Sequence, residues 1–348
     1  MLVKRELEEY PNGFKAYFFF SDTDSAHRLD NCFKIGDELD YLSEGDVIRL
    51  DTQNRSIRVL YRINSGHNSI LVTERCNSYC LMCSQPPKDR DDSYIIDEVL
   101  ESVPLMSRRT VELGITGGEP TLLGDSFIKI LFSIKNNLPF TSLHVLTNGR
   151  HFADLEFARK VAHVNHPDLM FGIPLYSDVS SLHDYVVQAE GAYYETIKGI
   201  LNLKRLSQKV EIRVVLHKQT FQRLPRLAEF IARNLLFVDH VALMGLEMMG
   251  FTKPNLPVLW IDPADYQSEL VEAVSILSRY KMNVSIYNHQ LCLLDPRLHE
   301  FSKKSISDWK NEYMPECSQC MKRNECGGFF SSAKFKYSDK IKPFVELL

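Results

Sequence analysis

The chain has 348 residues, 44% of them hydrophobic and 25% charged, a balance typical of a folded globular protein with one large domain and an appendage. Its formal net charge of −4 argues against a protein built mainly to coat nucleic acid. The sequence contains no apolar run long enough to span a bilayer, and its charged N-terminal residues lack the apolar core of a secretion signal. We therefore expect a cytoplasmic protein without a membrane partner.

Residues 1–65 predict a small β-rich appendage. The aromatic run Tyr17–Phe20 is typical of a strand, and residues 46–50 and 56–60 predict the two arms of a hairpin around a polar turn. Such an appendage could bind a peptide by adding a strand to the edge of its sheet. It could equally cap the rest of the fold.

From residue 66 to residue 281 the chain alternates between strand and helix patterns. The predicted strands are 69–73, 110–115, 143–147, 169–175, 210–217 and 237–246, and the predicted helices are 96–106, 126–136, 153–163, 192–207, 224–234 and 264–280. Six such units imply parallel strands joined by right-handed crossovers. The fold class is therefore α/β, and the closest architecture is a partial TIM-like (β/α)6 barrel, in which the chemistry takes place at the carboxyl ends of the strands.

Three cysteines follow the first predicted strand with the spacing C-x3-C-x2-C: Cys76, Cys80 and Cys83. In a chain without an export signal, clustered cysteines indicate metal ligands before disulfides. Three thiolates can hold three irons of a four-iron cluster and leave the fourth iron open, whereas ferredoxin and structural zinc sites use four protein ligands. The loop therefore predicts a cluster that acts on a molecule it binds.

Polar residues also follow the next strands. Gly117-Gly118-Glu119-Pro120 combines two glycines, which allow backbone to approach a ligand closely, with a carboxylate suited to a ligand ammonium group. An ordinary strand-to-helix turn would explain the same residues. Asn148 and Ser177 follow the third and fourth predicted strands and could be turn or capping residues. Arg213, in the fifth strand, could bind a carboxylate or face the helical layer.

Residues 282–348 hold a second group of cysteines after a strand-like segment at 283–287. The group consists of Cys292, Cys317, Cys320 and Cys326, the last three with the spacing C-x2-C-x5-C. Four thiolates satisfy a closed [4Fe–4S] site or a Zn(Cys)4 site, and the spacing does not distinguish the two. The remaining cysteine, Cys32, is expected to be a buried, inert thiol.

The C-x3-C-x2-C loop and the Gly-Gly-Glu-Pro segment together resemble the signatures of the radical S-adenosylmethionine (SAM) superfamily, although Met82 stands where that family usually has an aromatic residue. The resemblance implies a [4Fe–4S] cluster on the three cysteines, SAM on its open iron, and a 5′-deoxyadenosyl radical that takes hydrogen from the substrate. The residues that it implies for SAM binding are Gly117, Gly118, Glu119, Asn148, Ser177 and Arg213.

The C-terminal cysteines resemble the SPASM and twitch extensions of this superfamily, which implies one auxiliary [4Fe–4S] cluster with an electron-transfer or positioning role. With residues 76–87, 287–292 and 305–311, the chain resembles from about residue 65 onward the radical SAM maturases of the His-Xaa-Ser peptide systems, of the HxsC type. This implies a ribosomally made substrate with His-Xaa-Ser repeats, which would be oxidised or crosslinked. It also implies a sister maturase and a low-potential electron donor of the flavodoxin or ferredoxin type.

Two other functions stay open. The first is a radical SAM enzyme of cofactor or modified-nucleoside biosynthesis. The second is a non-catalytic binding protein that has a degenerate barrel and is held together by structural zinc. Acid-labile sulfide and iron would exclude the second function, because a structural zinc site contains neither.

Overall fold

The computed structural model describes residues 2–3, 15–20, 31–304 and 311–345, so most of the segment 305–311 lies outside the described residues. Its centre is a parallel sheet of seven strands in the order β12-β11-β10-β9-β8-β7-β6. In chain order the strands are β6 (His67–Leu71), β7 (Glu112–Thr116), β8 (Ser142–Leu146), β9 (Leu169–Pro174), β10 (Lys209–Leu216), β11 (His240–Gly245) and β12 (Val284–Tyr287).

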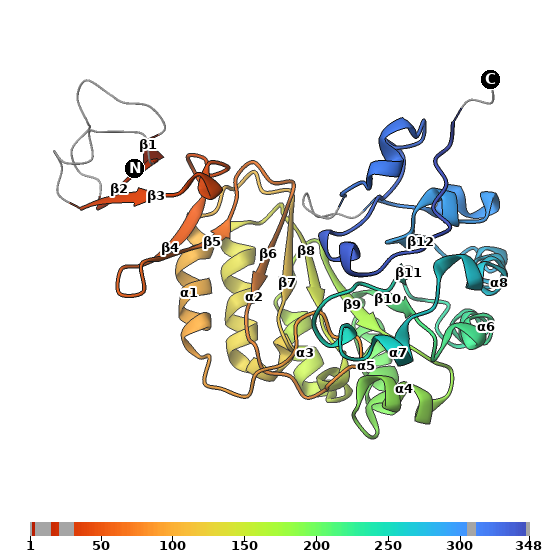
Figure 1. Cartoon of the computed structure of the whole chain (residues 1–348). Helices are drawn as coiled ribbons and strands as arrows, with labels where there is room; N and C mark the ends of the chain where they lie inside the picture. Colours follow the sequence, from red (N-terminus) through yellow and green to blue (C-terminus); the bar gives the residue numbers. More distant parts are fainter. Residues whose placement is uncertain (1, 4–14, 21–30, 305–310, 346–348) are drawn as a thin grey trace.

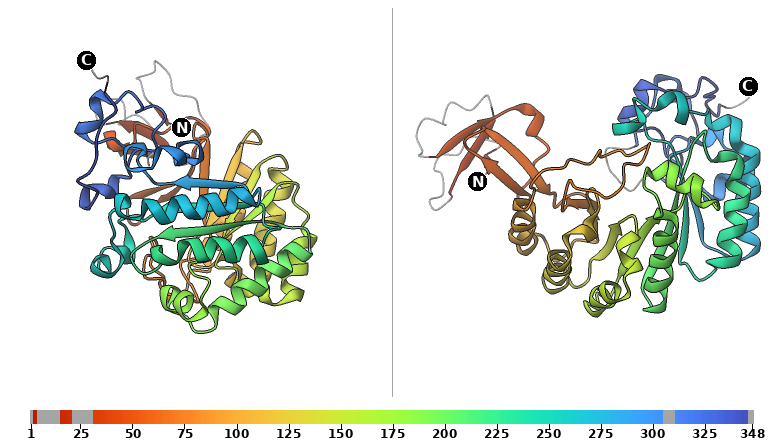
Figure 2. Two further views of the ribbon diagram at one scale, coloured as in Figure 1. Left: turned by 90° about the vertical axis from the view of Figure 1, so that its right-hand side faces the viewer. Right: turned by 90° about the horizontal axis from the view of Figure 1, so that it is seen from below.

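Helices cover one face of this sheet, and the sheet curves around the other face as an open half-barrel (Figure 1; Figure 2, right). The helices are α1 (Tyr94–Ser102), α2 (Asp125–Asn137), α3 (Leu155–His163), α4 (Ser180–Val187), α5 (Ala192–Arg205), α6 (Leu224–Asn234), α7 (Leu256–Leu259) and α8 (Gln267–Arg279). None of the helices in the described ranges is both long and apolar enough to cross a membrane.

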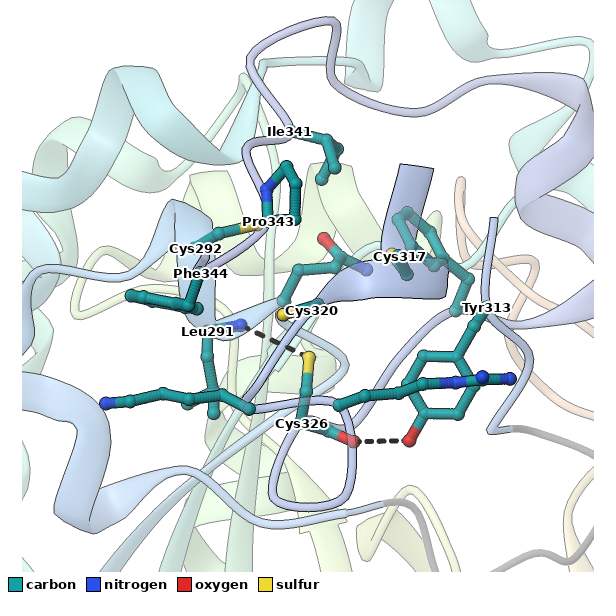
Figure 3. Close-up of a pocket in the computed structure, with 13 residues that line it drawn as sticks. Leu291, Cys292, Tyr313, Cys317, Cys320, Cys326, Ile341, Pro343 and Phe344 are labelled. Carbon is teal, nitrogen blue, oxygen red and sulfur yellow. Dashed lines mark hydrogen bonds between the residues drawn. The ribbon is translucent and has the colours of Figure 1, made fainter. Parts of the chain in front are cut away.

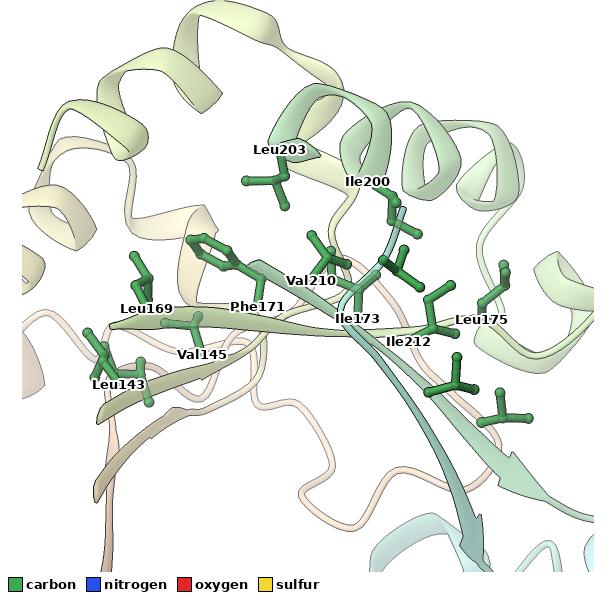
Figure 4. Close-up of a cluster of buried hydrophobic side chains, with 14 of the residues drawn as sticks. Leu143, Val145, Leu169, Phe171, Ile173, Leu175, Ile200, Leu203, Val210 and Ile212 are labelled. Carbon is green, nitrogen blue, oxygen red and sulfur yellow. The ribbon is translucent and has the colours of Figure 1, made fainter. Parts of the chain in front are cut away.

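The alternation of side chains along each strand determines the two faces of the sheet. The side chains that face the helices are apolar and buried, as in Val145, Phe171 and Ile212, which pack with Ile200 and Leu203 of α5 (Figure 4). The alternate positions therefore point to the concave face. Many of them are polar, so the interior of the half-barrel differs from the closely packed apolar core on its outside.

The N-terminal residues form two small sheets at one side of the half-barrel (Figure 1). β1 (Leu2–Val3), β2 (Tyr17–Phe20) and β3 (Cys32–Ile35) pair in parallel, and β4 (Val47–Asp51) and β5 (Ser56–Tyr61) pair as an antiparallel hairpin. The strand predicted at 17–20 and the predicted hairpin are both present. Cys32 is half-buried rather than buried, because it lies in the small sheet of β1–β3 and not in the main core.

The α/β half-barrel is confirmed, but some of its elements differ from the expected architecture, among them the short, unpredicted helix α7. The strand at 283–287 does not begin the C-terminal extension; as β12 it pairs in parallel with β11 and becomes the seventh strand of the sheet. A further helix, α4, lies between β9 and α5. Its eight residues include two β-branched valines at the end, and so short a segment carries little helical periodicity.

After β12 the described chain continues mainly as turns and short 3-10 helices, such as Leu291–Leu293 and Pro315–Gln319. This C-terminal segment folds back onto the sheet, since the backbone N–H of Lys303 donates to the carbonyl of Ile286 in β12 at 2.8 Å. Figure 1 shows it in blue beside the ends of β11 and β12. Both groups of predicted cysteines therefore belong to loops around one half-barrel.

Candidate active site at the carboxyl edge of the sheet

The cysteine loop follows β6 and is anchored by backbone from two distant segments. The N–H groups of Tyr79 and Leu81 donate to the carbonyls of Val187 and Val186 at the end of α4, at 3.0 and 2.9 Å. The carbonyl of Cys83 accepts from the N–H of Phe251 at 2.8 Å. Because backbone atoms make these contacts, the path of the loop depends little on its side chains.

The two glycines after β7 allow this turn to pack directly on the cysteine loop. The N–H of Gly118 donates to Thr73 O at 2.9 Å, and the N–H of Glu119 donates to Arg75 O at 2.8 Å. A Cβ on Gly117 would overlap the carbonyl oxygen of Thr73, and one on Gly118 would overlap that of Arg75. The glycines are therefore required for close packing between two loops, whatever ligand the turn also contacts.

Glu119 is fully buried, and its carboxylate accepts four hydrogen bonds. The donors are the N–H and hydroxyl of Thr121, the hydroxyl of Thr147 at 2.7 Å and the N–H of Asn148 at 2.6 Å. The carboxylate thus joins the turn after β7 to the turn after β8. All four donors to the Glu119 carboxylate belong to the protein. The expected contact between this carboxylate and the amino group of SAM therefore stays a prediction.

The turn after β8 also holds the cysteine loop. Asn148 Nδ2 donates to Asn77 Oδ1 at 2.6 Å, and Arg150 Nη1 donates to the carbonyl of Asn77 at 2.5 Å and to the hydroxyl of Ser78 at 3.1 Å. Glu195 of α5 orients the guanidinium through a 2.6 Å bond to Nε. Arg150 was not predicted as a site residue, and its position after an Asn-Gly turn was the only signal in the sequence.

Ser177 and Arg213 occupy different surroundings. Ser177 is buried, and its hydroxyl accepts from the N–H of Val179 at 3.0 Å, which is the contact of a turn residue. Arg213 points to the concave face, where it pairs with Glu211 at 2.7 Å and keeps 23% of its side chain exposed. The alternative that Arg213 faces the helical layer is wrong, because Ile212 and Val214 occupy that face.

Burial dominates the electrostatics of the three thiols. It raises the pKa of Cys76 to about 11 and that of Cys80 to about 12, and it also raises the pKa of Cys83. The charge of Glu119 adds to the shift at Cys76. A metal centre with positive charge would offset this penalty, because thiolates are the ligands that iron–sulfur clusters take. The three sulfur donors on one anchored loop therefore fit the predicted cluster.

A second apolar cluster, separate from the main core, packs against the cysteine loop. Met82 is buried in it beside Tyr176, Val187 and Leu259, with Cys80 at its edge. The position before the third cysteine, which is usually aromatic in the superfamily, is thus filled here by a flexible thioether. Tyr176 follows β9 and was not predicted as a site residue.

The four C-terminal cysteines line one pocket, although they come from two segments of the chain (Figure 3). Cys326 Sγ accepts from the N–H groups of Leu291 and Gly328, both at 3.4 Å. Burial raises the pKa of Cys292 and Cys317, and aromatic rings line the pocket. Backbone N–H groups directed at sulfur in an apolar pocket are suited to an iron–sulfur cluster.

Comparisons with known proteins agree with this geometry. The family model described as the radical SAM superfamily matches residues 70–231. No curated protein matches the chain. Among solved structures, Streptococcus suis SuiB bound to S-adenosylmethionine has 16% sequence identity and a TM-score of 0.51, over 66% of this chain and 51% of SuiB. The chain thus spans about half the length of SuiB.

A second similar structure is hexahistidine-tagged anSMEcpe with bound AdoMet. It has 15% identity and a TM-score of 0.54, and the similarity covers 79% of this chain and 88% of that one. At these identities the solved structures establish the shared half-barrel fold. The stretch that matches the family model, residues 70–231, contains the cysteine loop and most of the strands of the half-barrel.

Proposed function

We propose that this protein binds SAM at a [4Fe–4S] cluster on Cys76, Cys80 and Cys83 and oxidises or crosslinks a ribosomally made peptide. The observation that carries the proposal is the anchored loop with three thiols at the carboxyl edge of the sheet, packed on the turn around Glu119. When bound, the cluster and SAM supply a radical that removes a hydrogen atom from the substrate. The protein's own residues hold the loop in place.

A peptide is the favoured substrate class. SuiB, which shares the half-barrel at a TM-score of 0.50, was solved bound to its precursor peptide SuiA; the likeness covers 65% of this chain and 49% of SuiB, at 16% identity. The sequence resemblance to maturases of the His-Xaa-Ser systems specifies the substrate further, as a polypeptide with His-Xaa-Ser repeats.

The proposal also gives the C-terminal cysteines a role in the reaction. A second [4Fe–4S] cluster on Cys292, Cys317, Cys320 and Cys326 would accept the electron that remains on the substrate after hydrogen abstraction. A flavodoxin or ferredoxin would reduce the first cluster, and a sister maturase would act on the same polypeptide. This chemistry suits the reducing cytoplasm, where thiols stay available as ligands.

The test is the intact mass of a His-Xaa-Ser repeat polypeptide co-expressed with this protein, with Cys80→Ala as the control. We expect the peptide to lose hydrogens in the presence of the intact protein and to keep its mass with the variant. An unchanged mass with a protein that contains its full iron, in the presence of the sister maturase, would contradict the proposed substrate. The matched variant removes one cluster ligand, so any mass change that it retains would not come from this site.

A further inference from the structure

A second pocket lies between the carboxyl edge of the sheet and the C-terminal segment. On the sheet side it is lined by Leu216, Gly245 and Asn288, which end β10 and β11 and directly follow β12. On the other side its lining includes Gly328 and Phe330 of the C-terminal segment. The pocket is therefore at the same end of the strands as the cysteine loop.

Shared residues place this pocket between the two groups of cysteines. Leu246, which lines the pocket, also packs against the apolar cluster that holds Met82, with Cys80 at the edge of that cluster. Gln290 and Phe329 line both this pocket and the pocket of the C-terminal cysteines. A side chain bound here would thus lie between the first cysteine loop and the C-terminal cysteine site.

The lining of this second pocket is largely aromatic and contains little charge. Five of its residues carry aromatic rings: Trp260, Tyr266, Phe329, Phe330 and Tyr337. Lys336 is the single charged residue in the described lining, and its ammonium lies 5.3 Å from the centroid of the Trp260 ring. Lys336 is exposed, so this wall of the pocket borders solvent. Since no carboxylate is among these lining residues, the pocket suits an uncharged ring better than a cation.

Ser332 gives the pocket a polar group that lacks a partner. It is one of the lining residues, and its Oγ is buried without a hydrogen bond to any residue that the structure describes. A buried hydroxyl without a partner is unfavourable, and such groups are rare in native proteins. A ligand in the pocket that donates to this hydroxyl or accepts from it would remove the deficit.

We propose that this pocket binds the histidine side chain of the peptide substrate, and that Ser332 is its hydrogen-bond partner. The inference rests on the proposed function, in which the substrate carries His-Xaa-Ser repeats. A neutral imidazole has flat faces that pack against aromatic rings. One of its nitrogens donates and the other accepts, and a hydroxyl can bond to either. The serine of the repeat has no ring to pack in this way, so the histidine is the residue that the pocket selects.

The test is a double-mutant cycle between Ser332 and the peptide. Binding of a fluorescein-labelled peptide with one His-Ala-Ser unit to the anaerobically reconstituted protein is measured by fluorescence anisotropy. We expect Ser332→Ala to weaken binding by about 10-fold, as the loss of one hydrogen bond does. Replacing the peptide histidine by phenylalanine should cause a similar loss in the wild-type protein and no further loss in Ser332→Ala.

Ser331→Ala is the matched control, because Ser331 is the exposed neighbour of Ser332 in the same 3-10 helix and is not among the lining residues. It should bind the peptide as the wild type does. Ser332→Ala should also keep the wild-type unfolding midpoint, since its hydroxyl has no partner to lose. A second variant, Ala333→Leu, narrows the pocket and should weaken binding of the histidine and phenylalanine peptides alike.

Two results would overturn the pocket assignment and leave the proposed function intact. One is oxidation of the peptide together with additive effects of Ser332→Ala and the histidine replacement. The other is coupling of Ser332 to the peptide serine instead of the histidine. Binding with the expected pattern, but without any oxidation by the wild-type protein in the presence of SAM and reductant, would overturn the proposed function and keep the pocket. No binding to the wild-type protein would overturn both.

Discussion

Gly118 shows most directly how closely the two loops of the site approach each other. A Cβ at this position would overlap the carbonyl oxygen of Arg75 and press on the Cβ of Cys76. Because the obstacle is backbone, Gly118→Ala should displace the cysteine loop. We expect it to lose the iron of the first site, measured after reconstitution, while circular dichroism stays unchanged.

The control for this variant is Gly66→Ala, since no heavy atom lies near the position of a Cβ on Gly66. That variant should keep its full iron content. If Gly118→Ala bound iron as well as Gly66→Ala does, the packing between the two loops would not be required for the site.

The thiols themselves give a second prediction. Cys80→Ala should lower iron and acid-labile sulfide by about half, because the four C-terminal cysteines would keep their own cluster. Cys32→Ala should leave both quantities unchanged, since Cys32 lies in β3, outside both groups of ligands. Elemental analysis and a sulfide assay check this. Zinc without sulfide in the wild-type protein would contradict the iron–sulfur account.

At the residue scale, the sequence predicts ligands whose spacing is local and misses contacts that form over long distances. Cys76, Cys80 and Cys83 lie within one loop, so their pattern is visible before folding. The partner of Arg150, Asn77, lies 73 positions away in the chain. The periodic pattern of apolar residues gives no sign of such a pair. Ser177 has only the local contact of a turn residue, so its expected role in SAM binding stays a prediction.

Among the elements of the site, the turn after β8 holds the cysteine loop in place through the side chain of Arg150. Arg150→Met removes the hydrogen bonds to Asn77 and Ser78, and charged hydrogen bonds of this kind contribute about 2 kcal/mol. We expect chelator-induced loss of iron from the first site to become on the order of 30-fold faster. Arg159→Met, which breaks only an exposed pair within α3, should have no such effect.

The C-terminal extension can be tested as a separate element. A Cys317→Ala/Cys320→Ala double variant should lose the second cluster, because only two of its four ligands would remain. We expect deoxyadenosine formation to persist while the yield of oxidised peptide falls, since the electron left on the substrate has no acceptor. Full product from a folded double variant would exclude a redox role for this site.

The helices and strands of the half-barrel are predictable because apolar residues recur at the period of each element. The helix at 224–234 agrees with α6 (Leu224–Asn234). The strand expected at 283–287, at the start of the C-terminal extension, is β12 (Val284–Tyr287), and it pairs as the seventh strand of the sheet. Its partner β11 lies some forty residues earlier in the chain, and strand pairing over such a distance leaves no mark in the local pattern.

For the molecule as a whole, the N-terminal hairpin is packed on the half-barrel. Val47 and Tyr61 belong to the main apolar core, and the hydroxyl of Tyr61 is 2.9 Å from Thr110 Oγ1 in a buried contact. Arg49 and Arg58 of the hairpin pair with Glu98 of α1 at 2.8 and 3.3 Å. These contacts favour the capping role of the hairpin. A strand-adding role for residues 1–65 stays a prediction.

Tyr61→Ala should therefore destabilise the whole molecule. Removing a buried aromatic ring lowers the free energy of unfolding by about 3 kcal/mol, and we expect one cooperative transition at a lower denaturant midpoint. Tyr41→Ala is the comparison, because that ring is 46% exposed, and its midpoint should change little. Two separate transitions in Tyr61→Ala would mean that the hairpin and the half-barrel fold independently.

We expect the cysteine loop at the edge of the half-barrel to hold the cluster at which SAM is cleaved. The most direct measurement is the amount of 5′-deoxyadenosine that the anaerobically reconstituted protein forms from SAM with dithionite as the reductant. We expect deoxyadenosine from the wild-type protein and none from Cys80→Ala. No deoxyadenosine from wild-type protein that holds its full iron and sulfide would contradict it.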